Sequence, residues 1–218
     1  APGAGPGRWV ELGNGVAVMR TGASYAAETR RPSGWFRSGQ AADIALSSFG
    51  FGNAGGPLLF NHPGVVASDG TRLLLADRNN NRVLVWTKLP VGNTRPDFVL
   101  GQKTFTGNLP GTGRDGMRWP VSVSAAAGKV VVADTYNDRL LVWTRFPTRN
   151  GQPADLVLNA APGRPDSNPQ RALAWPWGVW TDGTKLAATT TAGGAVLLWN
   201  AFPARDDQPA DLVLRGGG

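Results

Sequence analysis

Few side chains of this sequence have the chemistry to catalyse a reaction or to hold a metal ion. Its 218 residues include one histidine, His62, and no cysteine, which excludes disulfides, cysteine nucleophiles and thiolate metal sites. A single histidine without cysteine cannot build a zinc site of the usual kind. Most of the 15 acidic residues recur at equivalent places, and no spacing among the others suggests an acid–base pair. We therefore expect no catalytic residue, no cofactor and no metal ligand.

The aspartates recur because they mark a repeated unit. Each of four aspartates opens a short apolar segment, at spacings of 54, 58 and 56 residues. These four are Asp43, Asp97, Asp155 and Asp211. Asp69 and Asp182 precede glycines in equivalent turns. Because aspartate at such places usually caps backbone N–H groups, we interpret all six as structural residues.

Two aspartate–arginine pairs are the most motif-like polar residues of the chain. Asp77 and Arg82 are five positions apart, and Asp134 and Arg139 repeat this spacing in an equivalent loop. A charge-assisted hydrogen bond between the two members would hold each loop in shape. We interpret both pairs as structural.

Three tryptophans also repeat in phase, and each closes an apolar run such as Val83-Leu84-Val85-Trp86. The set is Trp86, Trp143 and Trp199. Large aromatic side chains at equivalent positions usually fill a core, so we expect these three to pack within or between the repeated units.

The remaining tryptophans are the better functional clue, because nine tryptophans against two tyrosines is an unusual ratio. Trp119 and Trp175 occupy the position of His62, one residue before a proline, so we interpret His62 as a substituted packing residue. Trp177 and Trp180 have no counterparts, and period-2 alternation places Trp175 and Trp177 on one face of a strand and Trp180 on the other. These five residues are the candidate contacts for a ligand or partner. They could stack on a sugar, a base or a partner's side chain, or instead plug the narrow centre of a small ring.

Four copies of one strand-rich unit must position these residues. Each copy holds short β-branched or leucine-rich runs bounded by turn residues, and none shows a sustained helical period. Four strands in 54 to 58 residues are typical of a propeller blade. The predicted fold is all-β, a β-propeller of four four-stranded antiparallel blades at residues 8–46, 61–100, 119–158 and 175–214. Residues 1–7 are expected to be a flexible segment, and residues 8–218 a single propeller domain.

The first repeat is degraded but present. Residues 9–12 and 16–19, joined by Asn14-Gly15, predict a hairpin. A third strand is poorly marked near residues 24–28, and the last strand is expected at residues 42–46.

Repeats two and three resemble NHL-type propeller repeats in their long bacterial form. The resemblance lies in His62-Pro63-Gly64-Val65 and in the run of residues 74–86, which contains Ala-Asp and then Asn-Asn-Arg-Val-Leu-Val-Trp. Residues 132–140 repeat much of this run, whereas residues 189–194 replace it with Thr-Thr-Thr-Ala-Gly-Gly. The resemblance therefore covers nearly the whole chain, strongly in the middle and loosely at both ends.

The resemblance implies a ring, because NHL-like propellers usually close with six blades, whereas this chain supplies four. We favour a closed four-bladed ring, and the alternative is part of a larger ring completed by another chain or by missing blades. NHL-like lyases and related propeller lactonases hold a metal in the central channel. The inner strands here, at residues 65–67, 121–124 and 179–181, carry apolar or weakly polar residues that suit a hard cation poorly.

Charge and hydropathy limit which partners and which location the sequence supports. The net charge of +7 and the pI of about 10.7 favour acidic partners, but the basic residues are scattered and form no nucleic-acid patch. No apolar run approaches the length of a membrane span, so no transmembrane segment is expected. The small, flexible residues 1–7 are compatible with a mature end, and we expect an extracytoplasmic location, periplasmic or secreted.

Four functions follow from these observations, in decreasing order of support. The first is a non-catalytic protein-binding scaffold or accessory subunit of a larger assembly, with a protein partner or a second copy as the partner. The second is a carbohydrate-binding propeller that uses the tryptophans without counterparts. The third is nucleic-acid binding through a basic face, as some NHL domains bind RNA. A channel-site lyase or hydrolase is the weakest, because metal ligands are missing.

Overall fold

Each apolar run of the second, third and fourth repeats forms a β-strand, because β-branched and leucine side chains pack well on a pleated surface. The second repeat holds β3 (Pro63–Ser68), β4 (Leu73–Asp77), β5 (Arg82–Trp86) and β6 (Phe98–Leu100). The third holds β7 (Pro120–Ala126), β8 (Lys129–Asp134), β9 (Arg139–Trp143) and β10 (Leu156–Leu158). The fourth holds β11 (Pro176–Thr181), β12 (Leu186–Thr190), β13 (Ala195–Trp199) and β14 (Leu212–Arg215). Short 3-10 turns, η1 (Arg78–Asn80) and η2 (Thr135–Asn137), join the second and third strands of the first two of these sheets.

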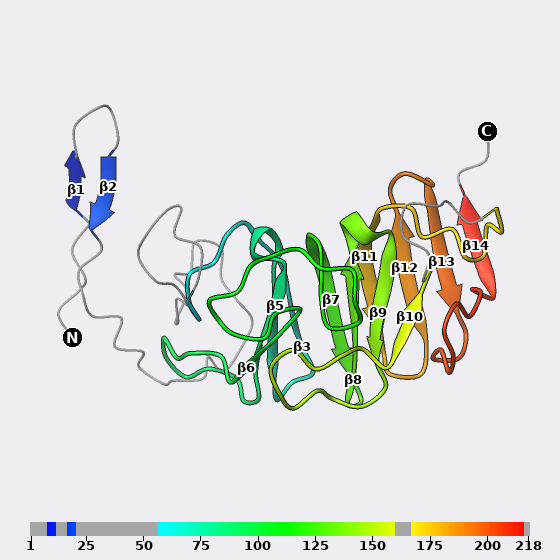
Figure 1. Ribbon diagram of the computed structural model, residues 1–218, viewed down its shortest axis with the longest axis horizontal. Coiled ribbons are helices and arrows are strands. Elements are labelled where there is room, and N and C mark those ends of the chain that lie inside the picture. The colour runs from blue at the N-terminus through cyan, green and yellow to red at the C-terminus, as the bar shows by residue number, and fades with distance from the viewer. Residues whose placement is uncertain (1–7, 12–16, 21–55, 160–166, 216–218) are drawn as a thin grey trace, which may run out of the picture. The chain divides into compact units, whose positions relative to one another are not determined.

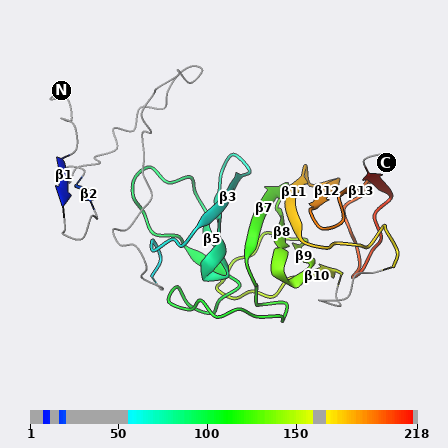
Figure 2. The same cartoon turned by 90° about the horizontal axis from the view of Figure 1, so that it is seen from above.

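Each of these repeats forms one four-stranded antiparallel sheet whose strands lie in chain order. The three sheets follow one another, with the inner strands β3, β7 and β11 in contact (Figures 1 and 2). We call these sheets blades 2, 3 and 4 after their repeats. The predicted all-β propeller architecture of antiparallel four-stranded blades is confirmed for them.

Two apolar cores hold the three blades together. The core between blades 2 and 3 includes Leu74, Val85 and Trp143, and the core between blades 3 and 4 includes Leu140 and Trp199. Alternate residues of β8, β9 and β10 in blade 3 enter the two cores, because successive side chains point to opposite faces of a sheet. Blade 3 is therefore buried on both faces.

The computed structural model describes residues 8–11, 17–20, 56–159 and 167–215. The chain divides into two compact units, Ala1–Leu46 with Val91–Thr94, and Ser47–Pro90 with Arg95–Gly218. In the first unit β1 (Arg8–Glu11) pairs antiparallel with β2 (Ala17–Arg20), so the predicted first hairpin is confirmed. The other predicted strands of the first repeat, and Asp43, lie outside the described residues. Closure of a ring and a single domain over residues 8–218 stay predictions.

The recurring strand-opening aspartates cap the end of the neighbouring strand. Asp97 Oδ2 accepts hydrogen bonds from the backbone N–H and the hydroxyl of Thr87, both at 2.6 Å. Asp155 binds Thr144 in the same way, and Asp211 accepts the N–H of Asn200. Each aspartate therefore ties the outer strand of its blade to the residue that follows the third strand.

The recurring tryptophans are buried beside these caps, as predicted. Trp86, Trp143 and Trp199 lie at the end of the third strand of their blades. The indole N–H of Trp143 donates to the carbonyl of Gln152 at 3.2 Å, and that of Trp199 donates to the carbonyl of Gln208 at 3.0 Å. In blades 3 and 4 the loop before the outer strand is thereby fixed to the core. In the described part of the chain, no helix is long and apolar enough to span a membrane.

The turn aspartates also cap backbone groups. Asp182 Oδ1 accepts hydrogen bonds from the Thr184 hydroxyl and from the N–H groups of Thr184 and Lys185, which lower the pKa of Asp182 to about 2. Asp69 forms the same turn in blade 2, where burial acts to raise its pKa. The N–H groups of Arg72 and Thr71 and the Arg72 guanidinium outweigh the burial and lower the pKa of Asp69.

Acid is expected to destabilise the fold partly through Asp182. Its pKa is about 2 in the folded chain and near the ordinary value of about 4 in the unfolded chain, so the unfolded state takes up the proton first as the pH falls. The stabilisation is complete above pH ~4 and is lost towards pH ~2. Urea unfolding between these pH values should show a shallower acid dependence in Asp182→Asn than in the wild type. Asp115→Asn, at an exposed loop carboxylate, is the control, and an unchanged dependence in Asp182→Asn would contradict the assignment.

Candidate functional site

Three equivalent residues before the inner strands adopt the left-handed backbone conformation. The φ angles of His62, Trp119 and Trp175 are 50°, 52° and 49°. This region is uncommon for residues with a Cβ atom and costs about 1 kcal/mol or more at each position. The surrounding structure must therefore hold these residues in place, and the same constraint aims their side chains.

The preceding blade holds the two tryptophans. The N–H of Trp119 donates to Asn81 Oδ1 at 2.9 Å, and the N–H of Trp175 donates to Asp138 Oδ1 at 2.8 Å. Asn81 and Asp138 end the turns η1 and η2 and are themselves left-handed, with φ of 52° and 51°. Each turn therefore sets the place of the tryptophan that begins the next blade.

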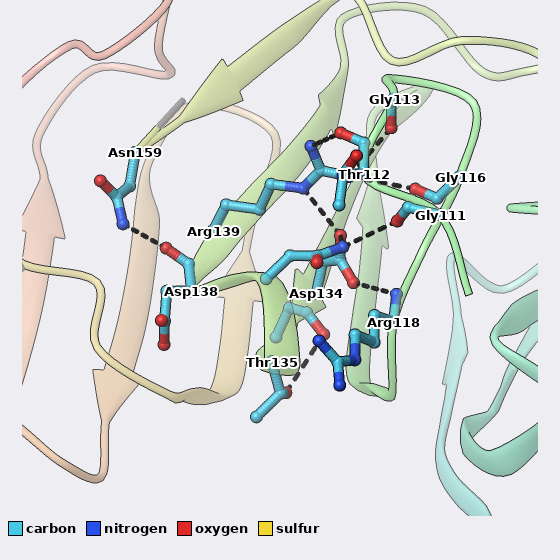
Figure 3. A network of polar contacts seen from close by, with 12 residues as sticks. Gly111, Thr112, Gly113, Gly116, Arg118, Asp134, Thr135, Asp138, Arg139 and Asn159 are labelled. Atoms are coloured by element: carbon cyan, nitrogen blue, oxygen red, sulfur yellow. Dashed lines mark hydrogen bonds and ion pairs between the residues drawn. The ribbon is translucent and has the colours of Figure 1, made fainter. Parts of the chain in front are cut away.

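A buried ion pair shapes each of these turns, as the sequence predicted. Asp134 accepts hydrogen bonds from Arg139 Nε at 2.7 Å, from Asn137 Nδ2 at 2.8 Å and from the N–H of Arg118 at 2.6 Å (Figure 3). Burial raises the pKa of Asp134, and the Arg139 guanidinium and these hydrogen bonds oppose the rise. The guanidinium of Arg139 also donates to three carbonyls of the preceding connector, those of Thr112, Gly113 and Gly116.

Blade 2 repeats this network with different carbonyls. Arg82 Nε lies 2.7 Å from Asp77 Oδ2, and both side chains are fully buried. The other guanidinium nitrogens of Arg82 donate to the carbonyls of Phe105, Gly56 and Leu59. One arginine thus fastens the connectors on both sides of its blade to the turn.

Blade 4 has lost both members of the pair together. Thr190 stands opposite Ala195 in the register in which Asp134 stands opposite Arg139. Thr190 is buried. Gly194, with φ of 55°, takes the left-handed place of Asp138. Blade 4 therefore has no side-chain acceptor at this place.

Aromatic side chains from blades 3 and 4 form a continuous row at these turns. The ring centroids of Trp119 and Tyr136 are 4.5 Å apart, and those of Tyr136 and Trp175 are 5.1 Å apart. Arg78 lies 4.9 Å over the ring of Trp119. We call Trp119, Tyr136, Trp175 and Trp177 the aromatic ridge.

The end of the ridge is hollowed. Trp175 and Trp177, with Thr191 and Ala192, line an open apolar hollow of about 570 Å³, and the two tryptophans are 43% and 42% exposed. Trp180 does not line this hollow. It stands opposite Ala187 in the sheet of blade 4, where its side chain is 54% exposed. The predicted contact residues therefore divide into two surfaces, and their roles in contact stay predictions.

Sequence reasoning missed Tyr136. It occupies the position of Asn79, where an aromatic residue replaces a polar residue of the repeat. That departure from the repeat was the available signal. Tyr136 joins the two recurring tryptophans into one surface, which their separate positions in the sequence did not reveal.

His62 is exposed, so its interpretation as a packing residue is corrected. Its Nδ1 lies 2.9 Å from Asn61 Oδ1 and 2.9 Å from Asn79 Nδ2. The physical reason is the side chain beside it. Tyr136 gives Trp119 an aromatic ring to pack against, whereas the equivalent Asn79 gives His62 a polar amide. His62 therefore belongs to a cluster of polar side chains, apart from the ridge.

The described residues offer little for acid–base or metal chemistry. No three His, Cys, Asp or Glu side chains among them come together as a metal site. The hydroxyls of Ser122 and Ser124 on β7 accept the N–H groups of Val179 and Thr181 on β11, at 3.3 and 3.1 Å. These inner-strand hydroxyls therefore join two blades.

Comparisons with known proteins add no family. No family model and no curated protein matches the chain, so the NHL type stays a prediction. Among solved structures, the chain is similar to the WD40 repeats of RRP9, with 14% identity and a TM-score of 0.42 over 65% of this chain and 38% of that one. The Myxococcus xanthus glutaminyl cyclase shows 17% identity and a TM-score of 0.32 over 62% and 46% of the two chains. A nidogen/laminin complex shows 17% identity and a TM-score of 0.34 over 65% and 60%.

This chain therefore spans less than two thirds of the length of each of these three proteins. The propeller architecture rests on the strand pairing and blade packing described above, because the likenesses are distant.

We predict that Asp134 and Arg139 are strongly coupled in stability. Asp134→Thr or Arg139→Ala alone should lower the free energy of unfolding by about 3–5 kcal/mol, because each leaves a buried charge unpaired. The double variant, which copies the Thr190 and Ala195 of blade 4, should cost clearly less than the sum. Urea unfolding followed by circular dichroism measures the cycle. Arg114→Ala, in an exposed ion pair with Asp206, should cost under about 1 kcal/mol, and additive effects at Asp134 and Arg139 would contradict the coupling.

Proposed function

We propose that this chain is a non-catalytic, NHL-like scaffold that binds a protein partner through the aromatic ridge. The observation that carries the proposal is the exposure of Trp175 and Trp177 on a backbone that is held rigidly. Exposed tryptophan, tyrosine and arginine are the residues that dominate protein interfaces. The ridge supplies tryptophan and tyrosine, and Arg118 beside it lies 5.5 Å over the ring of Tyr136.

The rigidity of the ridge supports this function. Binding costs entropy when side chains and loops must be ordered, and a surface that is already ordered avoids much of that cost. Trp119 and Trp175 are fixed by hydrogen bonds to the preceding blade, and the ring of Tyr136 packs between them. A partner would meet a surface that is formed before contact.

A carbohydrate ligand is the second candidate. The hollow at the end of the ridge places two indoles beside the polar Thr191, whose hydroxyl donates to the carbonyl of Trp175 at 3.0 Å. Indole faces could stack on the apolar face of a sugar ring. The hollow is open and almost wholly apolar, with few groups to recognise sugar hydroxyls, so we rank this ligand below a protein.

The partner should depend on the two exposed indoles. Alanine at Trp175 or Trp177 is expected to weaken binding by about 30-fold, the loss typical of a central interface anchor. Capture from the native source with wild-type chain, identification by mass spectrometry and titration calorimetry measure the effect. Leu109→Ala, at a leucine 78% exposed outside the ridge, should bind as the wild type does.

Two outcomes would contradict this function. One is a captured protein that binds the Trp175→Ala, Trp177→Ala double variant with unchanged affinity. The other is the absence of any partner together with a glycan that quenches tryptophan fluorescence in the wild type alone, which would favour the carbohydrate ligand.

A further inference from the structure

Blade 4 presents an exposed apolar face on the side away from blade 3. Trp180, Ala187, Leu198 and Leu212 stand opposite one another across the four strands and therefore share this face. Leu214 lies in the next row with Val196. Trp180 is 54% exposed, and Leu212 and Leu214 are each 48% exposed. We call these six residues the blade-4 face. It is carried by the sheet of β11 to β14 in Figure 1.

The same positions in the other blades are interfaces. In blade 3 the equivalents of five of the six residues are Val131, Leu140, Val142, Leu156 and Leu158, which pack against blade 4. In blade 2 the same five positions are Leu74, Val83, Val85, Phe98 and Leu100, which are buried against blade 3. In both cases the face is covered by the blade that follows. At these five positions the blade-4 face keeps the apolar character of its equivalents, whereas Trp180 stands where blade 3 has Ser124. An exposed apolar patch of this kind usually marks an interaction site.

A pair of hydrogen bonds, which we call the clasp, joins the outer strand of one blade to a loop of the blade that follows at each of these interfaces. The N–H of Val99 on β6 donates to Asn150 Oδ1 at 3.0 Å, and the N–H of Gly151 donates back to the carbonyl of Val99 at 2.8 Å. Val157 on β10 makes the same exchange with Asp206 and Asp207, at 2.8 and 3.0 Å. Val213 is the equivalent residue of β14, and within the described residues no loop takes that place beside it.

A cation–π contact is the third feature of each interface. Arg72 lies 4.0 Å over the ring of Phe146, and Lys129 on β8 lies 4.3 Å over the ring of Phe202. In both cases the cation belongs to the first hairpin of one blade and the ring to the blade that follows. Lys185 is the equivalent residue of blade 4, just before β12.

We infer that the blade-4 face binds a propeller blade of this same repeat, carried by a partner protein. Such a blade supplies a partner for each of the three features. It offers branched apolar side chains to the face and a phenylalanine to Lys185. It also offers Val213 an Asn or Asp side chain together with the N–H of the residue that follows. A helix or an extended peptide could cover the apolar residues but would not supply the clasp and the ring at their fixed spacing. The inference does not depend on the aromatic ridge, because Trp180 lies on a different surface.

The test uses a blade of known sequence as the probe. A second copy of residues 159–215 is appended after residue 215 of the full chain, and amide hydrogen exchange is followed by NMR. Exchange at Val213 should become at least about tenfold slower than in the parent chain and approach that of Val99 and Val157. The appended blade itself should be folded.

A matched fusion isolates the face and the clasp. It carries Leu198→Glu in the original blade 4 and Asp206→Ala in the appended copy, and its Val213 should exchange as fast as in the parent. Rapid exchange at Val213 in the first fusion, or an appended copy that remains unfolded, would overturn the inference. Slow exchange at Val213 in the parent chain would also overturn it. The occupant would then be a second copy if the rate depended on protein concentration, and another part of this chain if it did not.

Discussion

The carboxylate of Asp134 and the guanidinium of Arg139, like those of Asp77 and Arg82, are charges removed almost completely from water. Desolvating such ions is costly, and the pair is tolerated only when its remaining lone pairs and N–H groups find partners. Here the carboxylate of Asp134 receives three hydrogen bonds, and the guanidinium reaches carbonyls of the preceding connector. A shift of that connector would leave buried N–H groups unpaired, so the turn between the second and third strands has one stable shape.

The shape of this turn also sets the position of the residue that begins the next blade. The turn ends in a left-handed Asn81 or Asp138, whose side chain receives the N–H of the tryptophan that begins the next blade. The unfavourable backbone conformation of the tryptophan is offset by this bond and by the packing of its ring against Tyr136. The aromatic ridge is therefore built across a blade boundary, which makes its geometry a property of the assembled blades.

Blade 4 shows what happens when the pair is absent. Threonine and alanine replace both charges, so neither is left unpaired in the interior. Gly194 removes the acceptor for a following tryptophan, and the ridge ends here in an open hollow. The apolar face, Lys185 and the outward edge of Val213 are nevertheless kept. The turn of blade 4 thus departs from the repeat, whereas its outward apolar face largely keeps it.

The sequence by itself determined the repeat phase, the strands, the buried tryptophans and the Asp134–Arg139 pair, because these depend on short-range alternation and on a spacing that recurs. The exposed side of blade 4 and the contact of Tyr136 with Trp119 and Trp175 were decided only by the tertiary structure. Both depend on which blade packs against which, and such contacts join residues far apart in the chain. The exposure of His62 was decided in the same way, because its surroundings depend on Asn79 from another strand connection.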